Sequence, residues 1–204
     1  MDSLASYLAG HGYEGITFDF VGHKLGGSGG EMRRMMQAPE NLRDVLSWAR
    51  LHTTAERFVL VGHSLGGASA LQVAAWEQLY PVAEEVPPIA SVISICIGAE
   101  PAKGFESPLG KAMLEQRKDY VIGAPVNWLL DELSKIVLSA KDVAPLPALF
   151  IAGRQDILVS IARVEELANM AGKSASVSIL DTSHLEAPDK SRSLIFQWLE
   201  HLGV

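Results

Sequence analysis

Three side chains that lie far apart in the sequence, Ser64, Asp156 and His184, could together perform acyl transfer. A serine hydroxyl is a weak nucleophile until a neighbouring base takes its proton, and histidine is the most common base of this kind. A carboxylate bonded to the imidazole fixes its tautomer and stabilises its cation. We therefore predict a nucleophile at Ser64, a base at His184 and an orienting acid at Asp156.

The residues around Ser64 support its role as nucleophile. The run Gly62-His63-Ser64-Leu65-Gly66-Gly67 follows an apolar strand pattern and opens a helical pattern, as a G-x-S-x-G nucleophile elbow requires. We expect the sharp turn to strain the serine, and a Cβ at Gly62 or Gly66 to clash. The backbone N–H of Leu65, at the helix N-terminus, would stabilise an oxyanion. The alternative is a glycine-rich turn whose serine only caps the helix.

The base and the acid are each chosen from several candidates. His184 follows the last predicted strand, at the sheet edge expected to carry the serine, whereas the other five histidines lie in helices, in turns or beside the serine. Asp156 ends the turn after the preceding strand. Glu100 is the rival acid, and Asp181 is expected to shape its loop because it is too close in sequence to His184.

These side chains have to be positioned by an alternation of short apolar segments and helical patterns. Five segments rich in aliphatic residues are predicted to be buried parallel strands: residues 15–20, 57–62, 89–98, 148–153 and 175–180. Amphipathic or apolar helical patterns cover residues 39–52, 64–79, 161–171 and 188–202. We therefore predict one α/β domain over residues 1–204, with a doubly wound, mostly parallel sheet.

The segment from residue 101 to residue 147 interrupts this alternation, because it is much longer than a usual connection. Its second half, residues 125–141, carries apolar residues on a helical stripe that includes Val126, Leu129 and Leu133. We interpret the segment as a crossover helix with a small helical lid. The alternative is an ordinary surface excursion.

The composition argues against several classes of function. The formal net charge is −7 and the basic residues are scattered, so no basic patch is offered to nucleic acid. No membrane span and no signal peptide are recognised, and a cytoplasmic protein is expected. The single cysteine, Cys96, excludes an intrachain disulfide and is expected to be a core residue. No cluster has metal-ligand spacing, so neither a metal nor an organic cofactor is predicted, and no oligomeric state is indicated.

Several motifs together resemble the α/β-hydrolase superfamily. The resemblance is carried by the elbow around Ser64, by Gly153-Arg154-Gln155-Asp156 and by Ser183-His184, and residues 8–23 resemble the first helix, fourth strand and following loop. The order Ser, Asp, His is also that of these enzymes. The resemblance is nearest to serine esterases and monoacylglycerol-lipase-like members. It argues against relatives with Asp or Cys in the elbow, namely epoxide hydrolases, dehalogenases and dienelactone hydrolases.

The resemblance also implies that part of the fold is missing from this chain. Only the fourth to the eighth of the superfamily's eight strands are matched, and the third normally lies between the fourth and the fifth. The loop that supplies a second oxyanion donor is missing too, and His11-Gly12 is a weak substitute. We expect a fragment, or a chain begun at an internal methionine. The rival is a trimmed hydrolase in which residues 15–20 pair directly with residues 57–62.

The function expected from these residues is hydrolysis of a carboxylic ester with a small or medium acyl chain, through an acyl-enzyme. Flexible thioethers at Met32, Met35 and Met36 suit an adaptable pocket, although plain packing is favoured for them. Phe105 and Trp128 could line a lid or lie in the core. The alternative function is a non-catalytic or weakly active binding protein that lacks a complete oxyanion hole. A third is acyl transfer to an acceptor other than water.

Overall fold

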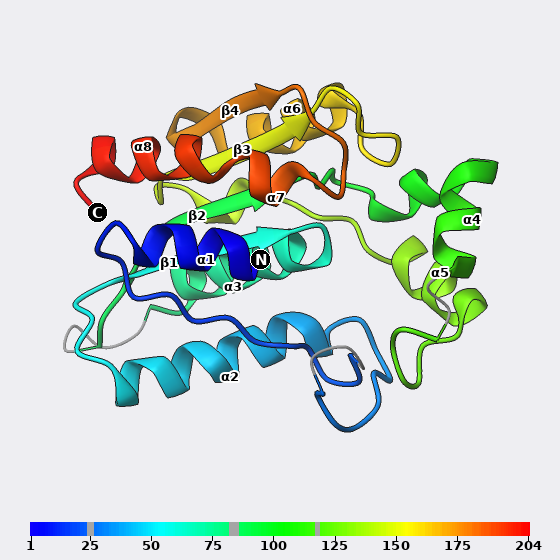
Figure 1. The fold of residues 1–204 in the computed structure, drawn as a ribbon, viewed down its shortest axis with the longest axis horizontal. Coiled ribbons are helices and arrows are strands. Elements are labelled where there is room, and N and C mark those ends of the chain that lie inside the picture. Colours follow the sequence, from blue (N-terminus) through cyan, green and yellow to red (C-terminus); the bar gives the residue numbers. More distant parts are fainter. Residues whose placement is uncertain (24–26, 82–85, 117–118) are drawn as a thin grey trace.

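The computed structural model describes residues 1–23, 27–81, 86–116 and 119–204. Its centre is a four-stranded parallel sheet of order β1-β2-β3-β4 (Figure 1). The strands are β1 (Phe58–His63), β2 (Ile89–Ile95), β3 (Ala148–Gly153) and β4 (Ala175–Leu180). All four lie at or within one residue of predicted segments, except that the second ends three residues early. The α/β prediction, with helices on both faces of the sheet, is confirmed.

The positions of the strands in the sheet follow their sequences. The interior strand β3 is buried at every residue, and β2 at all but one, because helices cover both faces. Strand β4 lies at an edge and leaves Val177 and Ile179 partly exposed. Parallel strands place their carboxyl ends at one edge of the sheet, which is where the predicted functional residues are found.

Two helical layers cover the sheet. On one face, α3 (Leu65–Leu79) and α6 (Ile161–Ala171) contact the strands, and α2 (Gln37–His52) packs on α3. A partly buried ion pair between Arg50 and Glu77, with 2.6 Å between Nη2 and Oε2, joins α2 to α3. On the other face, α1 (Asp2–Ala9) and α8 (Arg192–Leu202) share a core with inward residues of β2 and β3.

The prediction of a strand over residues 15–20 is wrong. The segment forms no strand, and a cavity of about 670 Å³ separates it from the outer edge of β1. A strand needs a neighbour that takes up its backbone hydrogen bonds, and here the nearest strand lies across the cavity. The alternative of a trimmed hydrolase required residues 15–20 to pair directly with β1. This pairing is absent from the described residues. The cavity lies where the resemblance placed a further strand.

Two predicted helices are shorter than their patterns. The last pattern divides at Ser191 into α7 (Ala187–Lys190) and α8, where the buried Ser191 hydroxyl donates to the carbonyl of Pro188. The pattern over residues 125–141 yields only α5 (Val126–Ser134), and the chain then leaves the helix. A serine that bonds to backbone carbonyls competes with helical hydrogen bonds, which accounts for the first of these breaks.

About half of the long connection between β2 and β3 is helical. It contains two short 3₁₀ turns, Pro101–Phe105 and Lys141–Val143, with α4 (Pro108–Gln116) and α5 between them. Figure 1 shows α4 and α5 beyond the carboxyl ends of the strands. The connection is also tied to the loop after residue 20, because His23 and Val121 form an antiparallel bridge. A helical layer therefore stands over the carboxyl edge of the sheet.

Candidate active site

Ser64 lies in a strained turn between β1 and α3. Its φ of 52° and ψ of −119° place a non-glycine residue in a conformation that is normally avoided. Its N–H donates to the Ile95 carbonyl at 2.9 Å, so the neighbouring strand β2 holds the turn in place. This is the strain that the sequence predicted for a nucleophile elbow.

The prediction for the elbow glycines is half wrong. A Cβ at Gly62 would lie 2.0 Å from the Gly66 carbonyl oxygen, so strand and helix approach each other as expected. A Cβ at Gly66 would meet nothing within 4 Å, whereas one at Gly67 would lie 2.8 Å from Ser94 Oγ. The helical rotation after the turn points Gly67, and not Gly66, at the sheet.

The predicted acid and the predicted base come from two loops packed against each other. Gly153 permits this packing, because a Cβ there would lie 2.5 Å from the Thr182 carbonyl oxygen. The loops are also joined by the hydrogen bond from the Gln155 N–H to that carbonyl, at 3.0 Å. In this arrangement Asp156 Oδ2 lies 2.8 Å from His184 Nδ1, and both side chains are buried.

The environment of Asp156 keeps it ionised. Burial alone would raise the pKa of this carboxyl, but the hydrogen bond and charge of His184, with backbone N–H groups of Val159 and Leu158, outweigh it. Those N–H groups donate to Oδ1 at 3.0 and 2.8 Å. The net result is a pKa below the usual value for aspartate, which leaves a carboxylate to orient His184.

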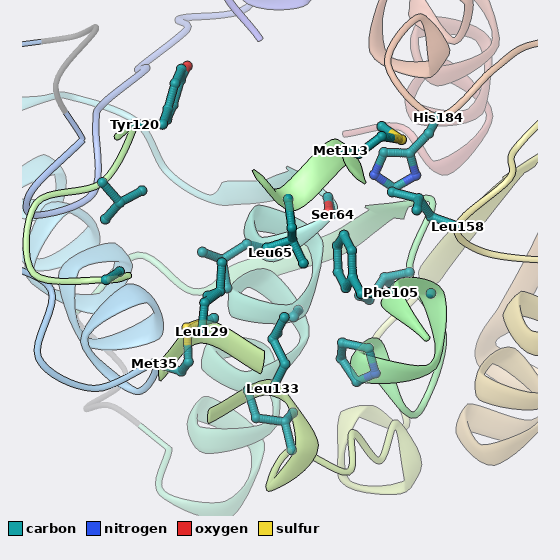
Figure 2. Close-up of a pocket in the computed structure, with 18 of the residues that line it drawn as sticks. Met35, Ser64, Leu65, Phe105, Met113, Tyr120, Leu129, Leu133, Leu158 and His184 are labelled. Carbon is teal, nitrogen blue, oxygen red and sulfur yellow. The ribbon is translucent and has the colours of Figure 1, made fainter. Parts of the chain in front are cut away.

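Ser64, Leu65 and His184 line one cavity of about 230 Å³ at the carboxyl edge of the sheet. Figure 2 shows the Ser64 hydroxyl and the His184 imidazole on the same side of it, with Leu129 and Leu133 across from them. Met32, Met35 and Phe105 also line the cavity. The same three residues belong to the hydrophobic cluster below the helical layer. Met36 is exposed, and Trp128 joins that cluster without lining the cavity.

The rival candidates have other partners. Glu100 pairs with Lys103, and Asp181 accepts a hydrogen bond from Gln155 Nε2 at 2.9 Å. His11 bonds to the Tyr7 carbonyl and lines the cavity beside β1, so it is not placed to serve as an oxyanion donor at Ser64. The described residues therefore bring the predicted acid and base together and keep their rivals apart.

Two contacts around the site were not expected from the sequence, one made by His63, which was predicted only as part of the elbow, and one made by Cys96. His63 lies against His184, with 4.7 Å between ring centroids, and burial followed by the charge of His184 lowers the pKa of His63 to about 4. Cys96 is fully buried with a φ of 54°, and burial followed by the charge of Asp156 strongly raises the pKa of its thiol. His63 ends an apolar strand and Cys96 directly follows one. Their positions at strand ends were the sequence signal that could have indicated that they lie near the site.

The sequence matches a family model described as the alpha/beta hydrolase family over residues 1–191. The chain belongs to this family. No curated protein matches this sequence. Among described residues, no helix is both long and apolar enough to cross a membrane.

Solved structures share the fold of this α/β-hydrolase at low sequence identity. An esterase from Pyrococcus furiosus is 19% identical with a TM-score of 0.76, and the match covers 100% of this chain and 75% of that one. A lipase-esterase related protein from Clostridium acetobutylicum is 20% identical with a TM-score of 0.68, covering 96% and 87%. The esterase domain of a Rhodothermus marinus protein is 21% identical with a TM-score of 0.64, covering 98% and 78%.

Proposed function

We propose that this α/β-hydrolase is a serine hydrolase that cleaves carboxylic esters through Ser64, His184 and Asp156. The observation that carries the proposal is the buried Asp156–His184 hydrogen bond of 2.8 Å at the rim of a cavity that also contains the strained Ser64. Structural neighbours described as esterases support the same class of reaction.

The proposed reaction has two steps. Ser64 Oγ attacks the ester carbonyl while His184 takes the hydroxyl proton, and the Leu65 N–H stabilises the resulting oxyanion. His184 then donates that proton to the departing alcohol, which leaves the acyl group on Ser64. In the second step His184 takes a proton from water, the hydroxide attacks the acyl-enzyme, and the proton returns to Ser64. Asp156 holds the imidazole in the required tautomer throughout.

The residues that line the cavity favour a substrate with an uncharged, apolar acyl group. Among the described residues that line it there is no Asp, Glu, Lys or Arg, and most of the lining is aliphatic, aromatic or methionine. A charged acyl group would lose its hydration there without a partner. We therefore propose esters of short to medium fatty acids, with the helical layer over residues 101–147 acting as the lid.

A second candidate is a binding protein with the same fold and little activity. It is favoured by the cavity beside β1, and the sequence pattern assigns only one backbone donor, Leu65, to the oxyanion. Loss of one donor lowers the rate by about 10² to 10³ in serine hydrolases, so weak activity is compatible with an otherwise intact triad.

A fluorophosphonate probe and a series of p-nitrophenyl esters separate the two candidates. For the hydrolase, we expect the probe to label the wild type but not Ser64→Ala, and hydrolysis to be lost in Ser64→Ala and His184→Gln. The matched control is Ser183→Ala, whose hydroxyl bonds to Glu186 and not to the triad. A folded wild type that is never labelled and hydrolyses none of the esters would favour the binding protein. Added alcohol, with product analysis, detects transfer to an acceptor other than water.

A further inference from the structure

Cys96 and His184, which line the cavity, form a cluster with His63 that acyl transfer uses only in part. His63 ends β1, Cys96 follows β2 and His184 lies in the loop after β4. The sheet brings one ligand atom of each side chain within 4.8 Å of the other two. His63 and Cys96 have no part in the proposed reaction, and the cluster therefore raises the question of a second use.

One nitrogen in this cluster lacks a hydrogen-bond partner. His63 Nε2 is buried, and no partner for it is present among the described residues. Leaving a buried polar atom unpaired costs stability, so such atoms call for a specific explanation. A neutral imidazole nitrogen that has no hydrogen-bond partner can offer its lone pair to a metal ion.

We propose that His63, Cys96 and His184 bind a zinc ion, and that zinc bound there inhibits the hydrolase. Two imidazole nitrogens and one thiolate form a donor set typical of zinc, whereas magnesium and calcium prefer oxygen. At ordinary zinc bond lengths the ligand atoms of a tetrahedral site lie about 3.5 Å apart. The ligand atoms now lie within 4.8 Å of one another, so binding requires the side chains to move closer together.

The neighbouring Asp156 completes the site without binding the metal. Its Oδ2 is bonded to His184 Nδ1, so the ring nitrogen left for a metal is Nε2. A carboxylate bonded to the second nitrogen of a metal-binding histidine is a common arrangement, and it orients the ring. The Asp156 carboxylate also matters for charge, because it lies beside both His184 and Cys96.

The proton and charge balance of binding is simple. The Cys96 thiol loses one proton to solvent, and its thiolate binds Zn²⁺ together with two neutral imidazoles. The two positive charges of the ion are then matched by the Cys96 thiolate and the Asp156 carboxylate. A buried site with no net charge avoids the desolvation cost of an isolated ion.

The inhibitory part of the proposal rests on the proposed function. If His184 Nε2 is bound to zinc, it has no lone pair with which to take the Ser64 proton, and acyl transfer stops. A chelator that removes the ion should restore the base. The binding part of the proposal does not depend on catalysis and is tested separately.

Zinc titration by calorimetry tests the binding site on chelator-treated full chain. We expect one equivalent to bind the wild type, with affinity reduced by about 100-fold or more in Cys96→Ser and in His63→Gln, as loss of a ligand should weaken a site more than loss of an outer partner. His201→Gln, which alters an exposed histidine of α8, should bind like the wild type. Circular dichroism checks that each variant is folded. Equal affinity of the wild type and both folded ligand variants would overturn the site.

Cobalt provides a second readout that is specific for the thiolate. Co²⁺ bound to the wild type should give a sulfur-to-cobalt charge-transfer band in the near ultraviolet, and the band should be missing in Cys96→Ser. A cobalt complex of the wild type without this band would exclude Cys96 as a ligand.

Two further comparisons separate failure of the zinc site from failure of the proposed function. Ser64→Ala should bind zinc as the wild type does, since Ser64 is not a ligand. If zinc binds but the wild type hydrolyses no ester, the site stands and the proposed function fails. If the wild type hydrolyses esters and zinc binds without slowing the reaction, the inhibitory role is overturned.

Discussion

The Asp156 carboxylate illustrates how much of the site depends on single hydrogen bonds. Oδ1 accepts two backbone N–H groups of its own loop, and Oδ2 is left for His184. The first two bonds fix where the carboxylate points, and the third orients His184, the proposed base. Position and function are therefore carried by different oxygens of the same side chain.

This division of roles predicts the effect of Asp156→Asn. The amide oxygen can still accept the two backbone bonds, but the NH₂ group cannot accept from His184 Nδ1, so the imidazole adopts the wrong tautomer. We expect kcat on p-nitrophenyl butyrate to fall by about 10⁴-fold, with only a small change in Tm. Asp181→Asn is the control, because that residue bonds to Gln155 and should retain activity. Activity close to the wild type in Asp156→Asn would contradict the role of the acid.

His63 predicts a pH dependence of stability. Its pKa is lowered from 6.5 to about 4 in the folded protein, so between these values the unfolded chain binds the proton and the folded chain does not. His63 therefore does not lower the free energy of unfolding above pH 6.5. It lowers this free energy progressively as the pH falls from 6.5 toward 4. By linkage the loss at pH 5 is about 2 kcal/mol.

Urea unfolding of the wild type and of His63→Gln at pH 7 and pH 5 measures this effect. The free energy of unfolding of the variant should fall less between the two pH values than that of the wild type. Replacement of the exposed His201 by Gln should leave the wild-type dependence unchanged. The assignment is rejected if His63→Gln and the wild type lose the same stability.

At the scale of elements, the elbow depends on how closely β1 approaches α3. The separation is set at Gly62, where the backbone of Gly66 and Gly67 occupies the space that any side chain would need. The same turn strains Ser64, and the bond from its N–H to Ile95 ties this conformation to the neighbouring strand. The strain is thus maintained in part by the pairing of β1 with β2.

Substitutions at Gly62 and Gly66 therefore form a matched pair. Gly62→Ala would place a Cβ 2.0 Å from a backbone oxygen, which cannot be relieved by a side-chain rotation. We expect a loss of about 3 kcal/mol or more, together with loss of activity. Gly66→Ala meets open space, and its stability should stay within about 1 kcal/mol of the wild type. Thermal unfolding of both variants checks this, and equal losses would contradict the observed packing.

At the scale of the whole molecule, the cavity is built from segments distant in the sequence. The loop carrying Met32 and Met35 is bonded to the helical layer, since the Met35 N–H donates to Glu132 Oε2 at 3.2 Å and the Met32 N–H to the Ile122 carbonyl at 2.8 Å. These bonds close one side of the cavity, and the sheet edge with Ser64 closes another. The length of the cavity therefore depends on how these distant segments pack together.

Leu133 of α5 provides a test of that length. It is buried, lines the cavity and lies across it from Ser64 in Figure 2. Leu133→Phe should shorten the cavity and lower kcat/KM for p-nitrophenyl octanoate by about tenfold relative to the acetate, which corresponds to 1–2 kcal/mol of lost apolar contact. Leu130→Phe, on the same helix but outside the cavity lining, is the control. Equal losses for both esters would show that Leu133 does not face the acyl chain.

The sequence by itself determined the order of strands and helices and the elbow, because these depend on local periodicity and on glycine at fixed spacing. It failed for residues 15–20, whose apolar composition suits a strand but whose pairing depends on a neighbour that the described chain does not supply. It also failed at Gly66, because only the rotation of α3 decides which glycine meets the sheet.

Only the tertiary structure decided what lies around the predicted base. Sequence order suggested that His184 and Asp156 share an edge, but the 2.8 Å between them depends on two loops packing at Gly153. The placement of His63 and Cys96 beside His184 could not be read from spacing at all, because the three residues lie at or after the ends of β1, β2 and β4, which meet at one edge only once the sheet has formed. Contacts between distant segments are fixed by the burial of whole faces, and single residues carry no local signal of them.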